Sequence, residues 1–262
     1  MQFDAIVLAG GESSMALKEM SPKNNEALID IGHHPMIVYI YQALIHSDSV
    51  RNIVICGPVE AISGLLEKKD NLYIVEAGDD TTASLSNGLE KLEQIGATEK
   101  ILVLPSDIPF ITTEAIDDFI SRCKDVNADF HYPLIRKELI EEKYPGMQRT
   151  YIKTKEGVFT GGNLLLINKK VIKPALGKAR EIIARRKNPV AIIRLFGFWI
   201  LIKYLLSQMT IDYAEKVFLN VMGIIGKAVF PPYAEIGVDV DKPSDLEFAK
   251  KYLSHIRFNG NA

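Results

Sequence analysis

The sequence predicts an α/β fold of three layers, with helices on both faces of a mostly parallel central sheet. Short apolar runs alternate with helix-like patterns through the first half of the chain, as in successive strand and helix units. These runs are rich in Val, Ile and Leu, which is typical of strands buried on both faces. The composition, 47% hydrophobic and 24% charged, is that of a globular protein, and no linker-like stretch divides the 262 residues. We therefore predict a single domain, residues 1–262.

The first half of the chain carries the clearest pattern of elements. Predicted strands cover residues 5–8, 52–56, 72–75 and 101–104. Predicted helices cover residues 36–45, 61–68, 82–95 and 114–123, the last with Thr112 or Thr113 as its N-cap.

The second half is less regular and contains a predicted helical insert at about residues 170–222. Helices are predicted at 170–186, 190–207 and 211–222, between strands at 163–167 and 227–230. A last helix is predicted at 244–256, with Pro243 near its first turn, where proline is favoured.

Charge and cysteine content argue against several classes of protein. The net charge of -2 gives no field that would gather nucleic acid, so we expect no nucleic-acid partner. Cys56 and Cys123 lie far apart and have no Cys or His at metal-ligand spacing around them, which argues against disulfides and a zinc site. The chain enters a strand pattern at Phe3 without a secretion-signal pattern before it. We therefore expect a cytoplasmic protein.

Residues 190–206 are apolar except for Arg194 and Lys203. The longest uncharged run, residues 195–202, is far short of the roughly 20 apolar residues that span a bilayer, so we expect no transmembrane segment. We interpret the stretch as a helix that covers the core. A homodimer face or a shallow contact with a membrane surface is the alternative.

A pair of glycines directly follows the first predicted strand. The strand ends at Leu8 and Ala9, and Gly10, Gly11 and Ser13 come next. Glycines allow a sharp turn in which consecutive backbone N–H groups approach an anion, and ligands of open α/β sheets bind beyond the carboxyl ends of strands. The segment therefore indicates a phosphate-binding turn, with a merely structural tight turn as the alternative.

Acidic residues follow two further predicted elements. Asp107 comes directly after the strand at 101–104, where a carboxylate can hold a divalent cation that bridges phosphate oxygens. Asp239 and Asp241 would lie on the same side of an extended segment and could complete a metal site with Asp107. The structural alternatives are that Asp107 caps its turn and that Asp241 caps the final helix.

Several separated segments match one family pattern in the right order. They are Leu8-Ala9-Gly10-Gly11 with Ser13; Ala27-Leu28-Ile29 through Gly32; Pro35-Met36-Ile37; Ser84-Leu85 with Gly88-Leu89; Asp107 with Pro109; Thr160-Gly161-Gly162-Asn163; and Asp239, Asp241 and Pro243 with Asp245-Leu246. Together they span residues 5 to 250 and resemble the MobA-like NTP transferase domain family. That family includes molybdenum-cofactor guanylyltransferases and is similar to the sugar and methylerythritol phosphate nucleotidylyltransferases of the GT-A type fold.

The resemblance implies a nucleotide-diphospho-sugar transferase (GT-A like) fold and a nucleotidyltransferase that uses Mg²⁺ or Mn²⁺. A phosphate or similar oxygen of a small phosphorylated or cofactor-like acceptor would attack the α-phosphorus of a nucleoside triphosphate, GTP or CTP being favoured, and release pyrophosphate. The implied nucleotide-binding residues are Leu8, Ala9, Gly10, Gly11, Ser13, Ser84, Gly88 and Asp107. The implied acceptor-binding residues are Gly161, Gly162 and Asn163, and the implied metal ligands are Asp107, Asp239 and Asp241.

The chain departs from the family pattern at two basic positions. Met15 stands where the family usually has an arginine, and Glu26 stands where it has a lysine. Lys18 and Lys23 are nearby and are our candidates for the catalytic cations beside Asp107. Two other functions stay open: a non-catalytic nucleotide sensor of the same fold, and a glycosyltransferase that uses a nucleotide sugar through the Asp239–Asp241 pair.

Overall fold

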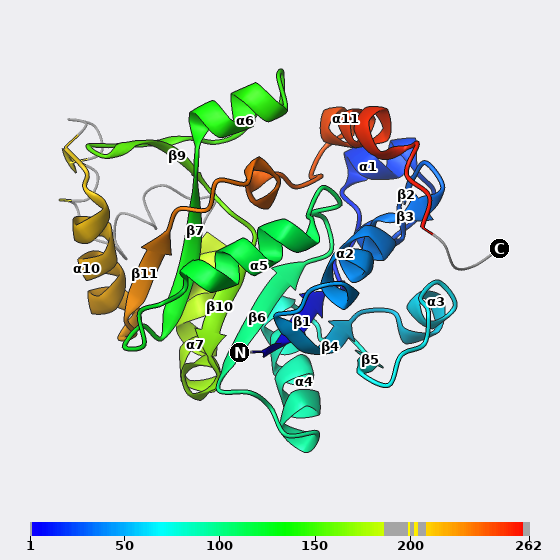
Figure 1. The fold of residues 1–262 in the computed structure, drawn as a ribbon, viewed down its shortest axis with the longest axis horizontal. Helices are drawn as coiled ribbons and strands as arrows, with labels where there is room; N and C mark the ends of the chain where they lie inside the picture. Colours follow the sequence, from blue (N-terminus) through cyan, green and yellow to red (C-terminus); the bar gives the residue numbers. More distant parts are fainter. Residues whose placement is uncertain (1, 186–198, 200–201, 204–207, 259–262) are drawn as a thin grey trace.

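The structure is a computed structural model that describes residues 2–185, 199, 202–203 and 208–258. Within these residues it has a central sheet of nine strands in the order β5-β4-β1-β6-β10-β7-β9-β8, with β11 paired to β7. Helices cover both faces of the sheet (Figure 1). The α/β class and the mostly parallel centre that the sequence predicts are confirmed.

The parallel half of the sheet is formed by the four strands predicted in the first half of the chain. These are β1 (Phe3–Leu8), β4 (Val50–Cys56), β5 (Leu72–Val75) and β6 (Lys100–Pro105). Successive residues of β1 enter opposite layers: Ala5 and Val7 belong to the core that includes α2 and α5, and Ile6 to the core that includes α4. This burial on both faces explains why the strand sequences lack alternation.

The other half of the sheet is largely antiparallel. Its strands are β7 (Phe130–Arg136), β8 (Ile152–Thr154), β9 (Gly157–Gly161), β10 (Leu165–Asn168) and β11 (Gly226–Val229). The sequence predicted β10 and β11 but missed the other three. Pro133 lies inside β7, and a proline within an apolar run argues against a central strand because it lacks an N–H donor. A small separate sheet joins β2 (Asp30–Ile31) to β3 (His34–Pro35).

The longer described helices match their predicted positions to within a few residues. They are α2 (Met36–Ile45), α4 (Thr81–Gln94), α5 (Thr113–Arg122), α7 (Lys169–Arg185), α10 (Ile211–Met222) and α11 (Pro243–Leu253). Thr112 is the N-cap of α5, and its side chain accepts a hydrogen bond from the Ala115 N–H. The helix predicted at 190–207 and the surface contact considered for residues 190–206 lie outside the described residues, apart from positions 199 and 202–203.

One predicted helix is wrong, and several short elements were not predicted. Instead of residues 61–68, the helix α3 covers Val59–Ser63 and stops at Gly64, a residue that disfavours helix continuation. The additional short elements are α1 (Met15–Met20), α6 (Lys137–Lys143), η1 (Glu26–Leu28) and η2 (Ala234–Gly237). No described helix is long and apolar enough to cross a lipid bilayer.

A buried histidine lies in the middle of the sheet. His131 on β7 is only 1% exposed, and neither ring nitrogen has a hydrogen-bond partner among the described residues. Burial, reinforced by the charge of Lys100 and opposed by that of Asp125, lowers the pKa of His131 to about 4. The folded chain therefore holds this ring neutral at pH values where a free histidine takes up a proton.

Replacing His131 with leucine should make the fold less sensitive to acid. Between about pH 6.5 and pH 4 the unfolded chain binds a proton that folded His131 does not, so stability falls as the pH falls through this window. The loss from this one group is roughly 2–3 kcal/mol by pH 4. In urea denaturation at pH 7 and pH 4.5, His131→Leu should lose less stability than the wild type, and the exposed His255→Leu should behave as the wild type. An unchanged acid sensitivity in His131→Leu would contradict this assignment.

Candidate active site

The glycine turn and Asp107 lie side by side at the carboxyl edge of the parallel strands. β1 and β6 are hydrogen-bonded neighbours, with Leu8 opposite Pro105. The Ser106 N–H donates to the Leu8 carbonyl at 3.1 Å, so the two chains leave the sheet together. Ala9 is buried, whereas Gly10 and Gly11 are exposed. The backbone N–H groups after β1 and the carboxylate after β6 therefore share one edge, which is where α/β sheets bind ligands.

Close packing, rather than an unusual backbone conformation, explains the two glycines. Neither Gly10 nor Gly11 has a positive φ, so the sharp turn expected from the sequence is not the reason for them. A β-carbon at Gly10 would lie 2.5 Å from the β-carbon of Ala77, which is too close to fit. A β-carbon at Gly11 would lie 3.1 Å from Oε2 of Glu26. The glycines thus let a neighbouring loop and a carboxylate approach the backbone.

Hydrogen bonds close the loop that follows the glycines. The Ser13 hydroxyl donates to the Lys23 carbonyl and the Ser13 N–H to the Asn24 carbonyl, both at 2.8 Å. The side-chain amide of Asn25 donates to the Ala9 carbonyl at 2.8 Å. Ser13 is buried and its hydroxyl closes the loop, and the nucleotide contact that the resemblance implies for it stays a prediction. The sequence analysis missed Asn25, whose signal is its place as the N-cap of η1.

Three carboxylates converge at the end of β6. One oxygen from each of Asp107, Asp239 and Asp241 lies within 4.8 Å of the others. A backbone hydrogen bond of 2.8 Å from the Val240 N–H to the Asp107 carbonyl joins the two segments that carry them. Asp241 does not cap α11, contrary to the alternative drawn from the sequence. The N-cap is Lys242, and the Asp241 N–H donates to Asp245 Oδ2 at 3.3 Å.

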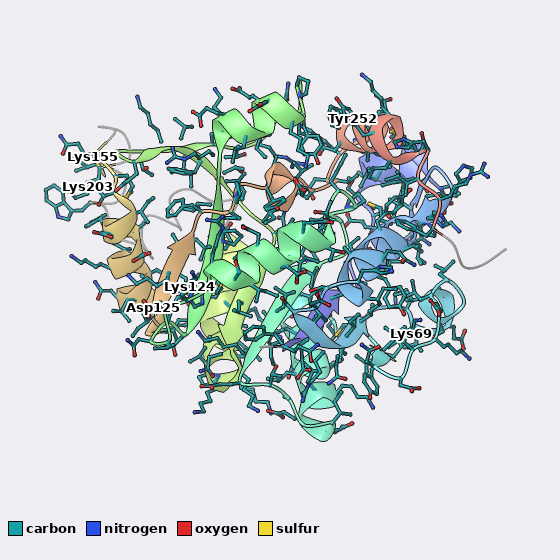
Figure 2. All side chains as sticks on the ribbon, viewed as in Figure 1. Lys69, Lys124, Asp125, Lys155, Lys203 and Tyr252 are labelled. Carbon is teal, nitrogen blue, oxygen red and sulfur yellow. The ribbon has the colours of Figure 1, made fainter. Side chains whose placement is uncertain are left out.

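Aromatic packing holds the two sides of this carboxylate site together. Phe110, shortly after Asp107, contacts Phe248 and Tyr252 on α11 with ring centroids 6.1 and 6.5 Å apart. Tyr252, labelled in Figure 2, stacks on Phe248 at 4.4 Å. Because α11 directly follows Asp241, these rings help to fix the Asp239–Asp241 segment against the end of β6.

The environment of Asp107 is unfavourable for a lone negative charge. Its Oδ1 is buried and has no hydrogen-bond partner among the described residues. Burial, followed by the charges of Asp239, Asp241 and Glu26, raises the pKa of Asp107 to about 8. Burial also raises the pKa of Asp239, and Arg149 opposes that shift. An unpartnered buried oxygen among hard oxygen donors fits a divalent cation such as Mg²⁺.

Glu26 is a fourth carboxylate beside the same turn. Its N–H donates to the Gly11 carbonyl at 3.1 Å, and its side chain lies over Gly11. Burial, followed by the charges of Asp241 and Asp239, raises the pKa of Glu26 to about 7. Lys18 and Lys23 are exposed, and no described contact brings either ammonium group to the carboxylates. The structure therefore does not bring these two predicted cations together with Asp107.

Arg149 is a site residue that the sequence analysis missed. Its guanidinium forms an ion pair with the Asp239 carboxylate and also donates to the Asp239 carbonyl. The side chain is only 10% exposed, and its Nε has no described partner. Arg149 lies in the connection between α6 and β8, which carries no recognisable sequence pattern. Its partner Asp239 is 90 residues away in the sequence, so only the fold shows their contact.

The predicted acceptor residues pack against β7 and against the segment that precedes Asp239. A β-carbon at Gly161 would overlap the Tyr132 hydroxyl at 1.9 Å, and one at Gly162 would lie 2.8 Å from Ile236. Asn163 donates to the Ile236 carbonyl from its backbone at 2.9 Å and its side chain at 3.1 Å. Gly162 and Asn163 therefore pack against η2, which ends two residues before Asp239, and Gly161 packs against Tyr132 on β7.

The predicted nucleotide-binding residues on α4, Ser84 and Gly88, have contacts within the fold. The Ser84 hydroxyl accepts from the Gly78 N–H and donates to the Asp80 carbonyl, both at 3.0 Å. A β-carbon at Gly88 would lie 2.8 Å from Cys56 Sγ and from Ile6. Gly88 therefore allows α4 to pack closely on β1 and β4, and lies under the helix rather than at the edge of the sheet.

Comparison with known proteins adds a family and a set of relatives. The family model described as the MobA-like NTP transferase domain matches residues 5–188. A hypothetical transferase from Thermus thermophilus is 33% identical, covers 94% of this chain and 100% of its own, and has a TM-score of 0.78. The 4-diphosphocytidyl-2C-methyl-D-erythritol synthase of Anaerococcus prevotii has the same fold, with 15% identity, a TM-score of 0.59 and 97% of each chain covered.

A second comparison reaches only part of the chain. The 2-C-methyl-D-erythritol 4-phosphate cytidylyltransferase of Bifidobacterium longum subsp. infantis is 29% identical over 124 residues. The match covers 44% of this chain, and the chain spans only 41% of the length of that relative. A CMP:2-keto-3-deoxy-manno-octonic acid synthetase, whose structure is a complex with CTP, is 13% identical with a TM-score of 0.59 and covers 97% of this chain and 99% of its own.

Neutralising Asp107 should stabilise the protein when no divalent cation is present. The folded-state pKa of about 8 lies above the ordinary value of 3.8, so the stability linked to protonated Asp107 is lost as the pH rises from about 4 towards 8. Asp107→Asn should therefore unfold at a higher temperature than the wild type at pH 8 in EDTA, and this advantage should shrink at pH 5. We expect a gain of about 1–3 kcal/mol in the free energy of unfolding. Each kcal/mol raises the unfolding temperature of a chain of this size by roughly 2–4 °C.

Added Mg²⁺ should reverse the order, because only the wild type has the full set of carboxylates. Thermal unfolding followed by circular dichroism checks both points, with the exposed Asp70→Asn as the matched control. If Asp107→Asn is less stable than the wild type at pH 8 in EDTA, the carboxylate is not the unfavourable charge described above.

Proposed function

Because this chain belongs to the MobA-like NTP transferase domain family, we propose that it is a metal-dependent nucleotidyltransferase. It transfers a nucleoside monophosphate from a triphosphate to a small phosphorylated or cofactor-like acceptor and releases pyrophosphate. The observation that carries the proposal is the convergence of Asp107, Asp239 and Asp241 beside the Gly10–Gly11 turn. Backbone N–H groups and a carboxylate site for a cation are the two things that a triphosphate needs for binding.

CTP is the first candidate for the triphosphate, and GTP is the second. The Bifidobacterium relative is named as a cytidylyltransferase, and the structure of the octonic acid synthetase was determined with CTP bound. GTP is the second candidate because the family that the sequence resembles includes guanylyltransferases. The use of cytidine nucleotides is stated for those relatives, and it supports CTP as the first candidate for this chain.

The proposed reaction is an in-line displacement of pyrophosphate at the α-phosphorus. An acceptor oxygen forms a bond to this phosphorus, the bond from the α-phosphorus to the oxygen that bridges to the β-phosphorus breaks, and its electron pair leaves with pyrophosphate. A divalent cation, when bound, neutralises the charge that develops on the phosphate oxygens. Asp107, Asp239 and Asp241 would hold that cation, and the N–H groups of Gly10 and Gly11 would orient the phosphates.

The acceptor is proposed to approach from the side of Tyr132 and Arg149. Burial and the charge of Asp239 raise the pKa of Tyr132, which places this phenol within the field of the site. Arg149 contacts Asp239 directly. A phenol that stays protonated and a guanidinium are both hydrogen-bond donors, which suits an anionic acceptor. We propose that Gly161, Gly162 and Asn163 contribute by positioning this side of the site.

Thermal unfolding with each of the four nucleoside triphosphates, with and without Mg²⁺, tests the proposal. A ligand at about a hundred times its dissociation constant stabilises a protein by roughly 2.7 kcal/mol, which for a chain of this size is about 5–10 °C. One triphosphate should give such a shift in the presence of Mg²⁺. Asp107→Ala should abolish the shift, and the exposed Asp70→Ala should retain it.

Pyrophosphate release distinguishes a nucleotidyltransferase from a non-catalytic nucleotide sensor. A Mg²⁺-dependent shift together with pyrophosphate release on adding phosphorylated acceptors supports the transferase. A shift with no release for any acceptor supports the nucleotide sensor that Met15 and Glu26 suggest. If no triphosphate shifts the unfolding temperature, both nucleotide functions are wrong for this chain.

A further inference from the structure

We propose that the buried carboxylate of Glu235 is a positioning residue for the candidate cation site. It joins the three segments of the chain that carry Asp107, Arg149 and Asp239, and it thereby sets the distances between them. The proposal rests on the proposed function, because it concerns the cation that Asp107, Asp239 and Asp241 would hold.

Glu235 is almost fully buried, which is rare for a carboxylate. Its side chain is 1% exposed and belongs to η2, the short helix that precedes Asp239. One carboxylate oxygen, Oε1, accepts a hydrogen bond of 3.2 Å from the Thr112 hydroxyl. The other oxygen, Oε2, lies 2.7 Å from the ammonium nitrogen of Lys143. Burying a carboxylate is unfavourable unless it is paired and hydrogen-bonded, so these two contacts hold η2 to its neighbours.

The first partner, Thr112, belongs to the segment that carries Asp107. Thr112 is the N-cap of α5 and comes five residues after Asp107. The connection between them is a tight turn, in which the Ile111 N–H donates to the Ile108 carbonyl at 3.0 Å. We therefore expect a displacement of Thr112 to reach Asp107.

The second partner, Lys143, belongs to the segment that carries Arg149. Lys143 is the last residue of α6, and the chain turns directly after it. In this turn the Tyr144 N–H donates to the Ile140 carbonyl at 2.8 Å, and the Met147 N–H donates to the Tyr144 carbonyl at 3.1 Å. The Arg149 guanidinium contacts the sulfur of Met147 at 3.7 Å. The ion pair of Lys143 therefore holds the start of the connection in which Arg149 lies.

Close packing limits the freedom of the chain between Glu235 and Asp239. A β-carbon at Gly237 would lie 3.1 and 3.2 Å from side chains of β9 and β7, so η2 packs tightly on these strands. Val238 and Val240, on either side of Asp239, are fully buried. A closely packed segment transmits a displacement instead of absorbing it. The contacts of Glu235 therefore determine where the Asp239 carboxylate lies.

Removing the charge of Lys143 tests this role without relying on activity. The affinity of the full-length protein for Mn²⁺ alone is measured by electron paramagnetic resonance of the free ion. Lys143→Met should bind Mn²⁺ roughly tenfold more weakly than the wild type, a typical loss when the partners that orient metal ligands are removed. This change makes the protein more negative, so a purely electrostatic influence would strengthen Mn²⁺ binding instead. Lys143→Arg, which can keep the ion pair, should retain wild-type affinity.

Arg51→Met is the matched control, because it also removes the cation from a buried carboxylate. Asp4 is fully buried and pairs with Arg51 at 2.8 Å. It lies near the amino-terminal end of β1, at the opposite edge of the sheet from Asp107. Arg51→Met should lower the unfolding temperature, as Lys143→Met should, but it should leave the affinity for Mn²⁺ unchanged.

Thr112→Val provides a second variant that changes no charge and tests the other contact of Glu235. It should also weaken Mn²⁺ binding, and Thr112→Ser, which keeps the hydroxyl, should not. Thr210→Val removes the N-cap hydroxyl of α10 and is the control for the loss of a helix cap. Thermal unfolding followed by circular dichroism identifies the variants that are folded, and Thr112→Val decides the question if Lys143→Met does not fold.

The outcomes separate the positioning role from the proposed function. If the wild type binds Mn²⁺ and neither Lys143→Met nor Thr112→Val weakens it, Glu235 only stabilises the fold, and the cation site is unaffected. If the two control variants weaken Mn²⁺ binding as much as the test variants do, the effect comes from lost stability and the positioning role is wrong. If the wild type binds no Mn²⁺, the metal-dependent function fails, and the positioning role fails with it.

Discussion

The candidate site depends on one backbone hydrogen bond, from the Val240 N–H to the Asp107 carbonyl. Asp107 lies at the end of β6, whereas Asp239 and Asp241 come from a segment more than 130 residues later in the chain. The hydrogen bond sets the two segments edge to edge, and residues on both sides support it. Asn163 fixes the chain before Asp239, and the rings of Phe248 and Tyr252 fix the helix after Asp241. The carboxylates can converge only because these separate contacts agree.

Bringing these carboxylates together is electrostatically unfavourable for the folded chain, and this indicates a functional site. Raised pKa values at Asp107 and Glu26 mean that the folded chain resists placing negative charge there. A structural ion pair would supply a cation to each carboxylate, but among the described residues Arg149 reaches only the Asp239 side of the cluster. Unfavourable groups of this kind tend to persist at functional sites, where a ligand supplies the missing charge. The raised pKa values are what we expect of a site that binds the proposed divalent cation and triphosphate.

Sequence patterns predicted the parts of the molecule that depend on local or periodic signals. The parallel strands were found because burial on both faces leaves uninterrupted apolar runs, and Asp107 was found because it follows such a run. Strand β7 was missed because Pro133 interrupts its pattern, and Arg149 because its partner is distant in sequence. The roles implied for Ser13 and Gly88 were drawn from a family pattern; the structure shows loop-closing and packing contacts for these residues, and their nucleotide contacts stay predictions. Glu26 was noticed only as a missing lysine, since its nearness to the aspartates depends on the fold.

Asp107, Asp239 and Asp241 are proposed to bind a divalent cation together with a triphosphate at this edge of the sheet. Anomalous scattering from crystals grown with Mn²⁺ and an α,β-methylene nucleoside triphosphate tests this proposal most directly. We expect a manganese peak bonded to Asp107 and to Asp239 or Asp241, with the phosphates over Gly10 and Gly11. A nucleotide bound elsewhere, or a carboxylate cluster that holds no manganese while the nucleotide is present, would contradict it.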